Sequence, residues 1–160
     1  MASDLSKVPL IARREIEARI VAPLIETLAA EQGREAALAR LGRVVERIAQ
    51  EAGAEMVRGA HETTIAALDT VLGFWSRDNA MEIEHLAHDN DRYDFNVRRC
   101  RYAEMYEELG LREVGFVLSC QRDFAFFKGL NSRIKLGRSQ TIMQGAPYCD
   151  FRFSMRQEGE

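Results

Sequence analysis

The sequence predicts an α+β domain in which a helical N-terminal half packs on a small antiparallel sheet. Apolar residues recur with helical spacing up to about residue 76, and the spacing becomes alternating after Asn79. Alternating segments in two places indicate two hairpins, with two further helices between them. We expect the 160 residues to form a single domain, with a helical platform at 1–78 and a sheet-containing catalytic half at 79–156.

The N-terminal platform is expected to contain three helices. Apolar residues of the first helix recur at four-residue spacing: Ile16, Ile20, Leu24 and Leu28. Pro23 should kink or divide this helix, and Gly33 should end it. The second helix is expected to reach Val57, and the third to stop after Trp75. We expect the apolar faces to pack within the domain, while the wide apolar arc of the first helix also fits a seam in a homo-oligomer.

The first hairpin follows Asn79, with a turn in the segment HDNDR. The apolar face of its second strand comprises Tyr93, Phe95 and Val97. The opposite face carries Asn96, Arg98 and, if the strand runs that far, Cys100. Such a face usually meets solvent, but an amide, a guanidinium and a thiol could instead line a pocket for a small carboxylate-bearing ligand.

Two helices are expected between the hairpins, the first of them ended by Gly110. If this helix begins at Cys100, it places Cys100 and Glu104 on one face. The apolar side of the second comprises Val117, Cys120, Phe124 and Phe127. Asp123 lies beside that apolar side, where burial would raise the pKa of its carboxyl group. Asp123 is therefore either a general acid/base or half of an internal ion pair with Arg122, Arg98 or Arg101.

The last hairpin closes with YCDFRFSM after a turn that contains Gly145 and Pro147. Cys149, Phe151 and Phe153 share one face of its second strand, a pattern that is most often plain core.

Bulk properties exclude several classes of protein. The net charge of −3, without a basic run, argues against a nucleic-acid partner. No apolar run approaches the ~20 residues needed to span a bilayer, and the N-terminus lacks the pattern of a secretory signal. The odd count of three cysteines, without disulfide-framework spacing, fits the cytoplasm. We expect a cytoplasmic protein with a small-molecule ligand and no membrane partner.

Three segments resemble the signature segments of the L-2-aminothiazoline-4-carboxylate hydrolase family: FNVRRCRYAEMYEELGL, LSCQRDFAFFKGLN and RSQTIMQGAPYCDFRF. The resemblance covers about residues 82–153. The matching positions are Asn96, Arg98, Cys100, Tyr102, Glu104, Cys120, Arg122, Asp123, Arg138, Thr141, Gly145, Cys149, Asp150 and Phe151. One departure is Tyr148, which stands before Cys149 where the family pattern leads us to expect a histidine.

The resemblance implies a hydrolase that opens a small cyclic amidine. In the namesake reaction, water adds to ring carbon C2 and the ring thiolate leaves, which gives N-carbamoyl-L-cysteine. This chemistry needs a base of tuned pKa, for which we expect Asp123 first and Glu104 second. The substrate-binding residues would be Asn96, Arg98, Tyr102 and Arg138. Among these, Arg98 and Arg138 could hold the substrate carboxylate bidentately.

The role of the cysteines stays open between two mechanisms. In one, a thiolate of Cys100, Cys120 or Cys149 attacks C2, which requires a lowered thiol pKa. In the other, the cysteines hold a zinc ion with Glu104 or Asp123, and the metal activates water. The cysteines lack close-paired zinc spacing, so we favour direct general acid/base or cysteine-assisted hydrolysis. A different function, a non-catalytic sensor module for heterocyclic or aromatic acids, would use the same polar residues.

Overall fold

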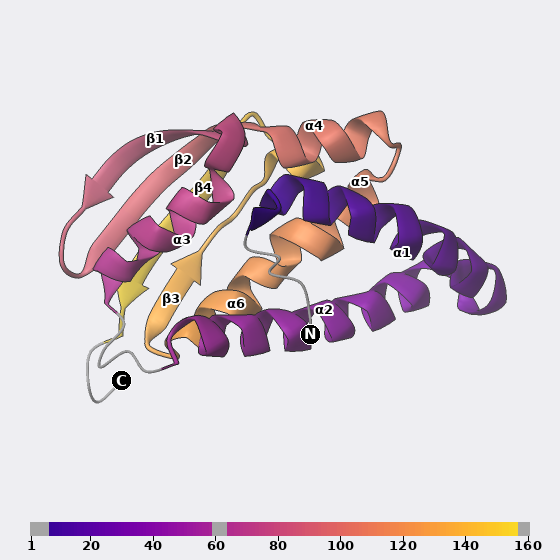
Figure 1. Cartoon of the computed structure of the whole chain (residues 1–160), viewed down its shortest axis with the longest axis horizontal. Coiled ribbons are helices and arrows are strands. Elements are labelled where there is room, and N and C mark those ends of the chain that lie inside the picture. Colours follow the sequence, from indigo (N-terminus) through magenta and orange to yellow (C-terminus); the bar gives the residue numbers. More distant parts are fainter. Residues whose placement is uncertain (1–6, 59–63, 157–160) are drawn as a thin grey trace.

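Two long helices form one side of the molecule. The computed structural model describes residues 7–58 and 64–156. Within them, α1 (Leu10–Gln32) and α2 (Arg34–Met56) pack side by side (Figure 1). The chain reverses between them at Gly33, whose φ of 88° lies in the region that favours glycine. Pro23 lies inside α1, which continues to Gln32, so Pro23 does not divide this helix. A kink at Pro23, the other expected effect, stays a prediction.

The face of α1 that packs inside the domain differs from the predicted one. The buried residues of α1 are Arg14, Ala18, Ala22 and Ile25. The predicted stripe is largely exposed, at 58% for Ile16, 70% for Ile20 and 57% for Leu24. Small alanines let α1 approach its neighbours closely, and this excludes the bulkier stripe from the interior. A homo-oligomer through this exposed stripe stays a prediction.

The four-stranded antiparallel sheet has the order β1-β2-β4-β3. Its strands are β1 (Met81–His88), β2 (Arg92–Cys100), β3 (Ile134–Gly137) and β4 (Cys149–Met155). The first hairpin is confirmed, and the second hairpin pairs β3 with β4. The expected α+β class, with helices packed on a small antiparallel sheet, is therefore confirmed.

The middle of the chain is helical between the two hairpins. Cys100 ends β2, and α4 (Arg101–Glu108) begins one residue later, so Cys100 and Glu104 do not share a helical face as expected. The predicted second helix is a continuous run of three segments: α5 (Arg112–Gly115), the π-helical η4 (Phe116–Gln121) and α6 (Arg122–Leu130). Phe124, expected on the apolar side, is 44% exposed because the π-helical turns rotate the residues after them.

Two apolar clusters divide the core. In one, helix α3 (Leu68–Trp75), the 3₁₀ turn η2 (Ile65–Ala67) and α6 pack on the sheet, where Tyr93, Phe95 and Val97 of β2 are buried as predicted. The other joins α1 and α2 to α4, α5 and η4. The remaining short turns are η3 (Arg77–Asn79) and η5 (Ile142–Gln144). A pocket can therefore form where the two clusters meet.

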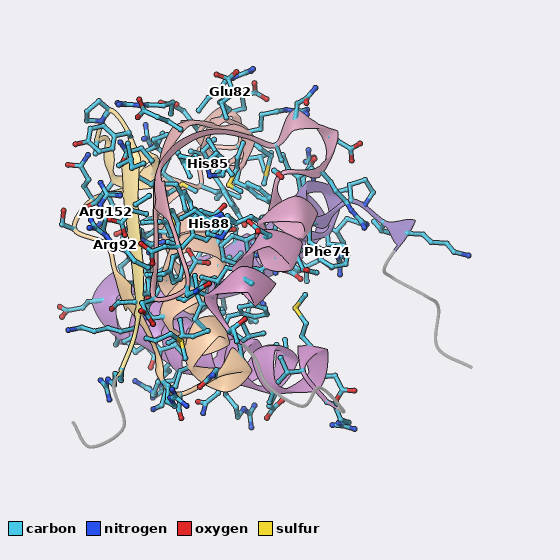
Figure 2. The ribbon with its side chains drawn as sticks, turned by 90° about the vertical axis from the view of Figure 1, so that its left-hand side faces the viewer. Phe74, Glu82, His85, His88, Arg92 and Arg152 are labelled. Carbon is cyan, nitrogen blue, oxygen red and sulfur yellow. The ribbon has the colours of Figure 1, made fainter. Side chains whose placement is uncertain are left out.

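The sheet face turned away from these helices carries a polar network. Arg92 and Arg152 both pair with the buried carboxylate of Asp94, and Arg152 Nη2 donates to Asn96 Oδ1 at 2.9 Å. Figure 2 shows Arg92 and Arg152 along the sheet, on the side opposite Phe74 of α3. The polar groups on the predicted polar face of β2 thus find their hydrogen-bond and ion-pair partners among side chains on the same face of the sheet.

Across the two described stretches, every helix is too short or too polar to cross a membrane.

Candidate active site

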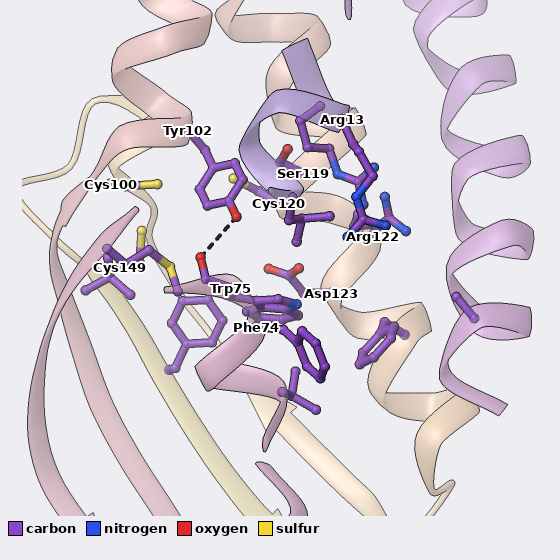
Figure 3. A pocket seen from close by; sticks show the side chains of 18 of the residues that line it. Arg13, Phe74, Trp75, Cys100, Tyr102, Ser119, Cys120, Arg122, Asp123 and Cys149 are labelled. Carbon is purple, nitrogen blue, oxygen red and sulfur yellow. Dashed lines mark hydrogen bonds between the residues drawn. The ribbon is translucent and has the colours of Figure 1, made fainter. Parts of the chain in front are cut away.

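A pocket of about 590 Å³ lies at the junction of the two apolar clusters (Figure 3). This volume is within the usual range for small-molecule sites. Residues from α1, α2, α3, the first hairpin, α4, η4, α6 and β4 line the pocket: Leu10, Arg13, Arg14, Ala52, Glu55, Met56, Val71, Phe74, Trp75, Met81, Val97, Cys100, Tyr102, Ser119, Cys120, Arg122, Asp123, Phe126, Arg138, Cys149 and Phe151. Six of the sequence-predicted site residues are among them: Asp123, the three cysteines, Tyr102 and Arg138.

Asp123 and Arg138 form a buried ion pair in the wall of this pocket. Arg138 Nη1 donates to Asp123 Oδ2 at 2.5 Å, and the two side chains are 3% and 10% exposed. Arg138 Nη2 donates to the backbone oxygen of Cys120 at 2.7 Å, which fixes the guanidinium plane. No described hydrogen bond occupies the other carboxylate oxygen, Oδ1. Figure 3 shows the Asp123 carboxylate pointing into the pocket.

Burial raises the pKa of the Asp123 carboxyl to about 6. The charge and hydrogen bond of Arg138 act in the opposite direction, and the charges of Arg122 and Arg14 also lower this pKa. A carboxyl group with a pKa near 6 is mostly ionised at neutral pH but is more basic than an ordinary aspartate. Asp123 is therefore part of an internal ion pair, with Arg138 and not with the expected Arg122, Arg98 or Arg101. Its raised pKa lies in the range that suits a general base.

The π-helical segment η4 places polar groups beside this ion pair. Insertion of wider turns changes the angular spacing of side chains, and π-helical turns are frequent at functional sites. Here Ser119 and Cys120 of η4 line the pocket together with Arg122 and Asp123, which begin α6. Four polar side chains within five consecutive positions thus reach one cavity, more than one face of a regular α-helix would present.

The three cysteines line the pocket as free thiols. Burial raises the pKa of all three, to about 11 for Cys100, well above the usual value for Cys120, and upward for Cys149. Cys149 Sγ also accepts a hydrogen bond from the Ile142 backbone N–H at 3.2 Å. Such thiols stay protonated at neutral pH, which is the opposite of the activation that a cysteine nucleophile needs.

The donor set does not fit a zinc centre. Among residues 7–58 and 64–156, no group of three or more His, Cys, Asp or Glu side chains is placed to hold a metal ion. Asp123 is engaged by Arg138, and Glu104 is absent from the pocket lining.

One end of the pocket is rich in arginine. Arg13 and Arg14 of α1 and Arg122 of α6 line this arginine end. Arg14 has a carboxylate partner, since its Nη1 donates to both oxygens of Glu17 at 2.7 and 2.6 Å. Burial and the nearby charge of Arg14 lower the pKa of Arg122 to about 10. Figure 3 shows Arg13 and Arg122 on the same side of the pocket, close to Ser119 and Asp123.

The opposite part of the lining is apolar. Val71, Phe74 and Trp75 of α3 face Phe126 of α6, with the Trp75 and Phe126 ring centroids 6.0 Å apart. We call these four residues the apolar end. Tyr102 Oη donates to the Trp75 backbone oxygen at 3.0 Å, the bond drawn in Figure 3, so its hydroxyl anchors α3. The pocket therefore has a cationic end and an aromatic end, with Asp123 between them.

Three predicted site residues lie outside the pocket lining. Arg98 pairs with Glu84 at 2.6 Å and stacks over Tyr148, the residue that departs from the family pattern. Asn96 donates to Glu84 at 3.1 Å in the polar network of the open sheet face. Glu104 is 43% exposed and pairs with Arg99 at 2.7 Å, which lowers the pKa of its carboxyl. Period-two alternation points Asn96 and Arg98 away from the helices. Arg98 is exposed there, as the solvated-face reading of the sequence expects, whereas Asn96 is buried within the polar network.

Asp150 supports the site from outside. Its carboxylate accepts from the backbone N–H groups of Ser139 and Gln140 at 3.0 and 2.8 Å, and from the Ser139 hydroxyl at 2.6 Å. These residues directly follow Arg138, so Asp150 fixes the backbone that carries the partner of Asp123. Thr141 continues this ordered segment, because its Oγ1 accepts from the Gln144 N–H at 3.2 Å.

Sequence reasoning missed the contribution of α1 and α3 to the site. Arg13, Arg14, Ser119 and Trp75 were given no role, and Arg122 was considered only as an ion-pair partner or a family position. One signal was present in the sequence: Arg14 recurs at helical spacing with Ala18, Ala22 and Ile25, the set of residues that the structure buries. The convergence of Arg13 and Arg14 with Arg122 depends on the tertiary packing of α1 beside η4 and α6.

Comparisons with known proteins agree with the motif resemblance. A model of the family "L-2-amino-thiazoline-4-carboxylic acid hydrolase" matches residues 13–153. A search of curated proteins finds no match. Among solved structures, the chain is similar to the phenol-responsive sensory domain of the transcription activator PoxR with phenol, at 14% identity and a TM-score of 0.48, covering 86% of this chain and 73% of that one.

Proposed function

The chain belongs to the L-2-amino-thiazoline-4-carboxylic acid hydrolase family, and from this premise we propose that it opens a small heterocyclic amidine- or amide-type ring that bears a carboxylate. Family membership supports a hydrolase activity. The observation that carries the proposal is the buried Asp123 carboxyl in the pocket wall, with one oxygen held by Arg138 and a pKa of about 6.

In the proposed reaction, Asp123 is the general base. Its Oδ1 accepts a proton from a water molecule, and the water oxygen attacks the ring carbon between the two heteroatoms. The tetrahedral intermediate then collapses, the carbon–sulfur or carbon–nitrogen ring bond breaks, and the leaving atom takes the proton back from Asp123. A positioned base of this kind contributes roughly 10²- to 10⁴-fold to the rate. Arg138 is a positioning residue, because it orients the carboxylate and limits the rise of its pKa.

Direct water attack is preferred over a cysteine nucleophile. The raised pKa values of Cys100, Cys120 and Cys149 leave little thiolate at neutral pH. The cysteines instead serve as small apolar groups of the pocket wall, which keep water activity low around Asp123. The free state of all three thiols also supports the proposed cytoplasmic location.

A substrate panel tests the proposed activity. The purified protein is incubated with 2-aminothiazoline-4-carboxylate, with carboxylated hydantoins and with lactams, and the products are analysed by mass spectrometry. We expect at least one ring to gain the mass of one water molecule in an enzyme-dependent reaction. Tight binding without turnover across the whole panel would instead favour the sensor module as the function.

A further inference from the structure

The pocket contains more positive charge than its own residues neutralise. Four arginines line it, against the two carboxylates of Asp123 and Glu55. Asp123 is taken by Arg138, and Glu55 pairs with Arg58. Of the arginine end, only Arg14 has a carboxylate partner within the described part of the chain. Among the described residues, Arg13 and Arg122 therefore have no carboxylate at ion-pair distance, although the more distant charges of Glu17 and Asp123 act on Arg122.

The placement of Arg13 and Arg122 is costly without a ligand. Arg13 Nε is buried and has no hydrogen-bond partner among the described residues. Arg122 is half-buried, and the charge of Arg14 beside it makes its protonated form less favourable. Removing a charged group from water without a partner is unfavourable, and an anion that supplies acceptors offsets this cost. A planar carboxylate fits the donor geometry of guanidinium groups.

The apolar end indicates the chemistry of the part of the ligand that is not the acid group. Phe74 is 36% exposed although it lines the cavity, and Trp75 and Phe126 are incompletely buried beside it. A single five-membered ring held at the arginine end would leave the cavity-facing surface of these side chains without a ligand group to cover it. The volume of about 590 Å³ accommodates a larger molecule.

We propose that the pocket binds an organic acid whose carboxylate lies at Arg13 and Arg122, and whose bulky apolar body packs on Phe74, Trp75 and Phe126. The inference rests on the proposed function, since it names the substrate class of the same site. Arg13 and Arg122 thus take the place of Arg98 and Arg138 as the residues that bind the substrate carboxylate. Arg98 lies outside the pocket, and Arg138 is paired with Asp123. In this arrangement Asp123 lies between the acid group and the apolar body, within reach of a ring that joins them.

Trp75 provides a direct readout of binding because it is the only tryptophan in the chain and lines the pocket. Its fluorescence is titrated with cyclohexylacetate, with the neutral isostere cyclohexylacetamide, and with acetate; none of these absorbs at the excitation wavelength. We expect cyclohexylacetate to bind about tenfold or more tightly than the amide, since a charge-assisted pair is worth about 1.5 kcal/mol or more. Acetate should bind at least about tenfold more weakly than cyclohexylacetate, because it leaves the apolar end empty.

Arginine variants identify the anchor. Arg122→Gln and, independently, Arg13→Gln should remove most of the preference for the acid over the amide. Arg40→Gln, which makes the same charge change on the exposed face of α2, should leave it intact. Circular dichroism verifies that each variant folds. Equal affinity for acid and amide, equal affinity for acetate and cyclohexylacetate, or an equal loss in Arg40→Gln would overturn the inference. Failure of every ring-opening assay would leave these binding results unchanged, so the two proposals fail separately.

Discussion

At the scale of single residues, the chemistry depends on how burial and charge act on Asp123. Burial alone favours the neutral acid, whereas the guanidinium group of Arg138 favours the carboxylate. The balance puts the pKa at about 6, which lies between the pKa of an ordinary aspartate and that of a group that is protonated at neutral pH. A base with this pKa is ionised at pH 7 and still accepts a proton readily.

This balance predicts the pH dependence of the reaction. Because the base must be ionised, kcat/KM should fall as the pH decreases through about 6. Arg138→Gln removes the charge that lowers this pKa, so the acid limb should move to higher pH. The measurement is a pH–rate profile of wild type and variant between pH 4.5 and 9. An acid limb that stays in place in Arg138→Gln would contradict the assigned role of Arg138.

The cysteines give a second prediction at this scale. Because burial keeps their thiols protonated, Cys100→Ala and Cys120→Ala should retain most of the turnover, whereas loss of a nucleophile would abolish it. Cys149→Ala should also remain active, with a lower melting temperature because its side chain fills the core between β4 and η5. Initial rates at saturating substrate distinguish direct water attack from attack by a cysteine. Complete inactivity of any one well-folded variant would restore the covalent mechanism.

At the scale of elements, the crossing of α2 and α6 holds the two halves of the pocket at a fixed distance. A Cβ on Gly53 would lie 2.1 Å from the Phe126 oxygen, and a Cβ on Gly129 would lie 2.0 Å from the Gln50 oxygen. Both obstacles are backbone atoms, which cannot move aside as a flexible side chain can. The two helices therefore touch because both carry glycine at the crossing, and Phe126 reaches the pocket from it.

The crossing makes the effect of one added methyl group predictable. Gly129→Ala should force α2 and α6 apart and destabilise the protein by about 1–3 kcal/mol. Gly73→Ala is the matched control, because it adds the same group to helix α3 with nothing within 4 Å. The control should be neutral or slightly stabilising. Thermal unfolding followed by circular dichroism compares the two, and equal melting temperatures would show that the crossing is less tight than described.

At the scale of the whole molecule, the sheet and the helical platform meet around the pocket, and this explains what the sequence could predict. Alternation and helical spacing are local patterns, so the β2 and β4 faces and the helical run around Asp123 were predictable from the sequence. The arginine end was not, because Arg13 reaches Arg122 only through the packing of α1 beside η4 and α6. Asn96 and Arg98 were drawn towards the site by the family resemblance, although their strand face points away from the helices.

The exposed stripe on α1 yields a prediction about assembly. Ile16, Ile20 and Leu24 lie on one side of the helix and are more than half exposed. If this stripe is the seam of a homo-oligomer, Ile20→Glu should convert the assembly to a monomer without loss of secondary structure. Sedimentation velocity gives the molar mass of the wild-type protein and that of the variant. A wild-type protein that is already monomeric at micromolar concentration would remove this prediction.

The role of Asp123 as the base is tested by the turnover of Asp123→Asn, measured together with the ligand affinity of the variant. On the substrate that wild type opens, the variant should lose at least about 10²-fold in kcat, because it lacks the base. Its affinity for cyclohexylacetate, reported by Trp75 fluorescence, should stay close to that of wild type, since the acid group is held by Arg13 and Arg122. An Asp123→Asn variant that folds, binds and turns over at the wild-type rate would show that Asp123 is not the base.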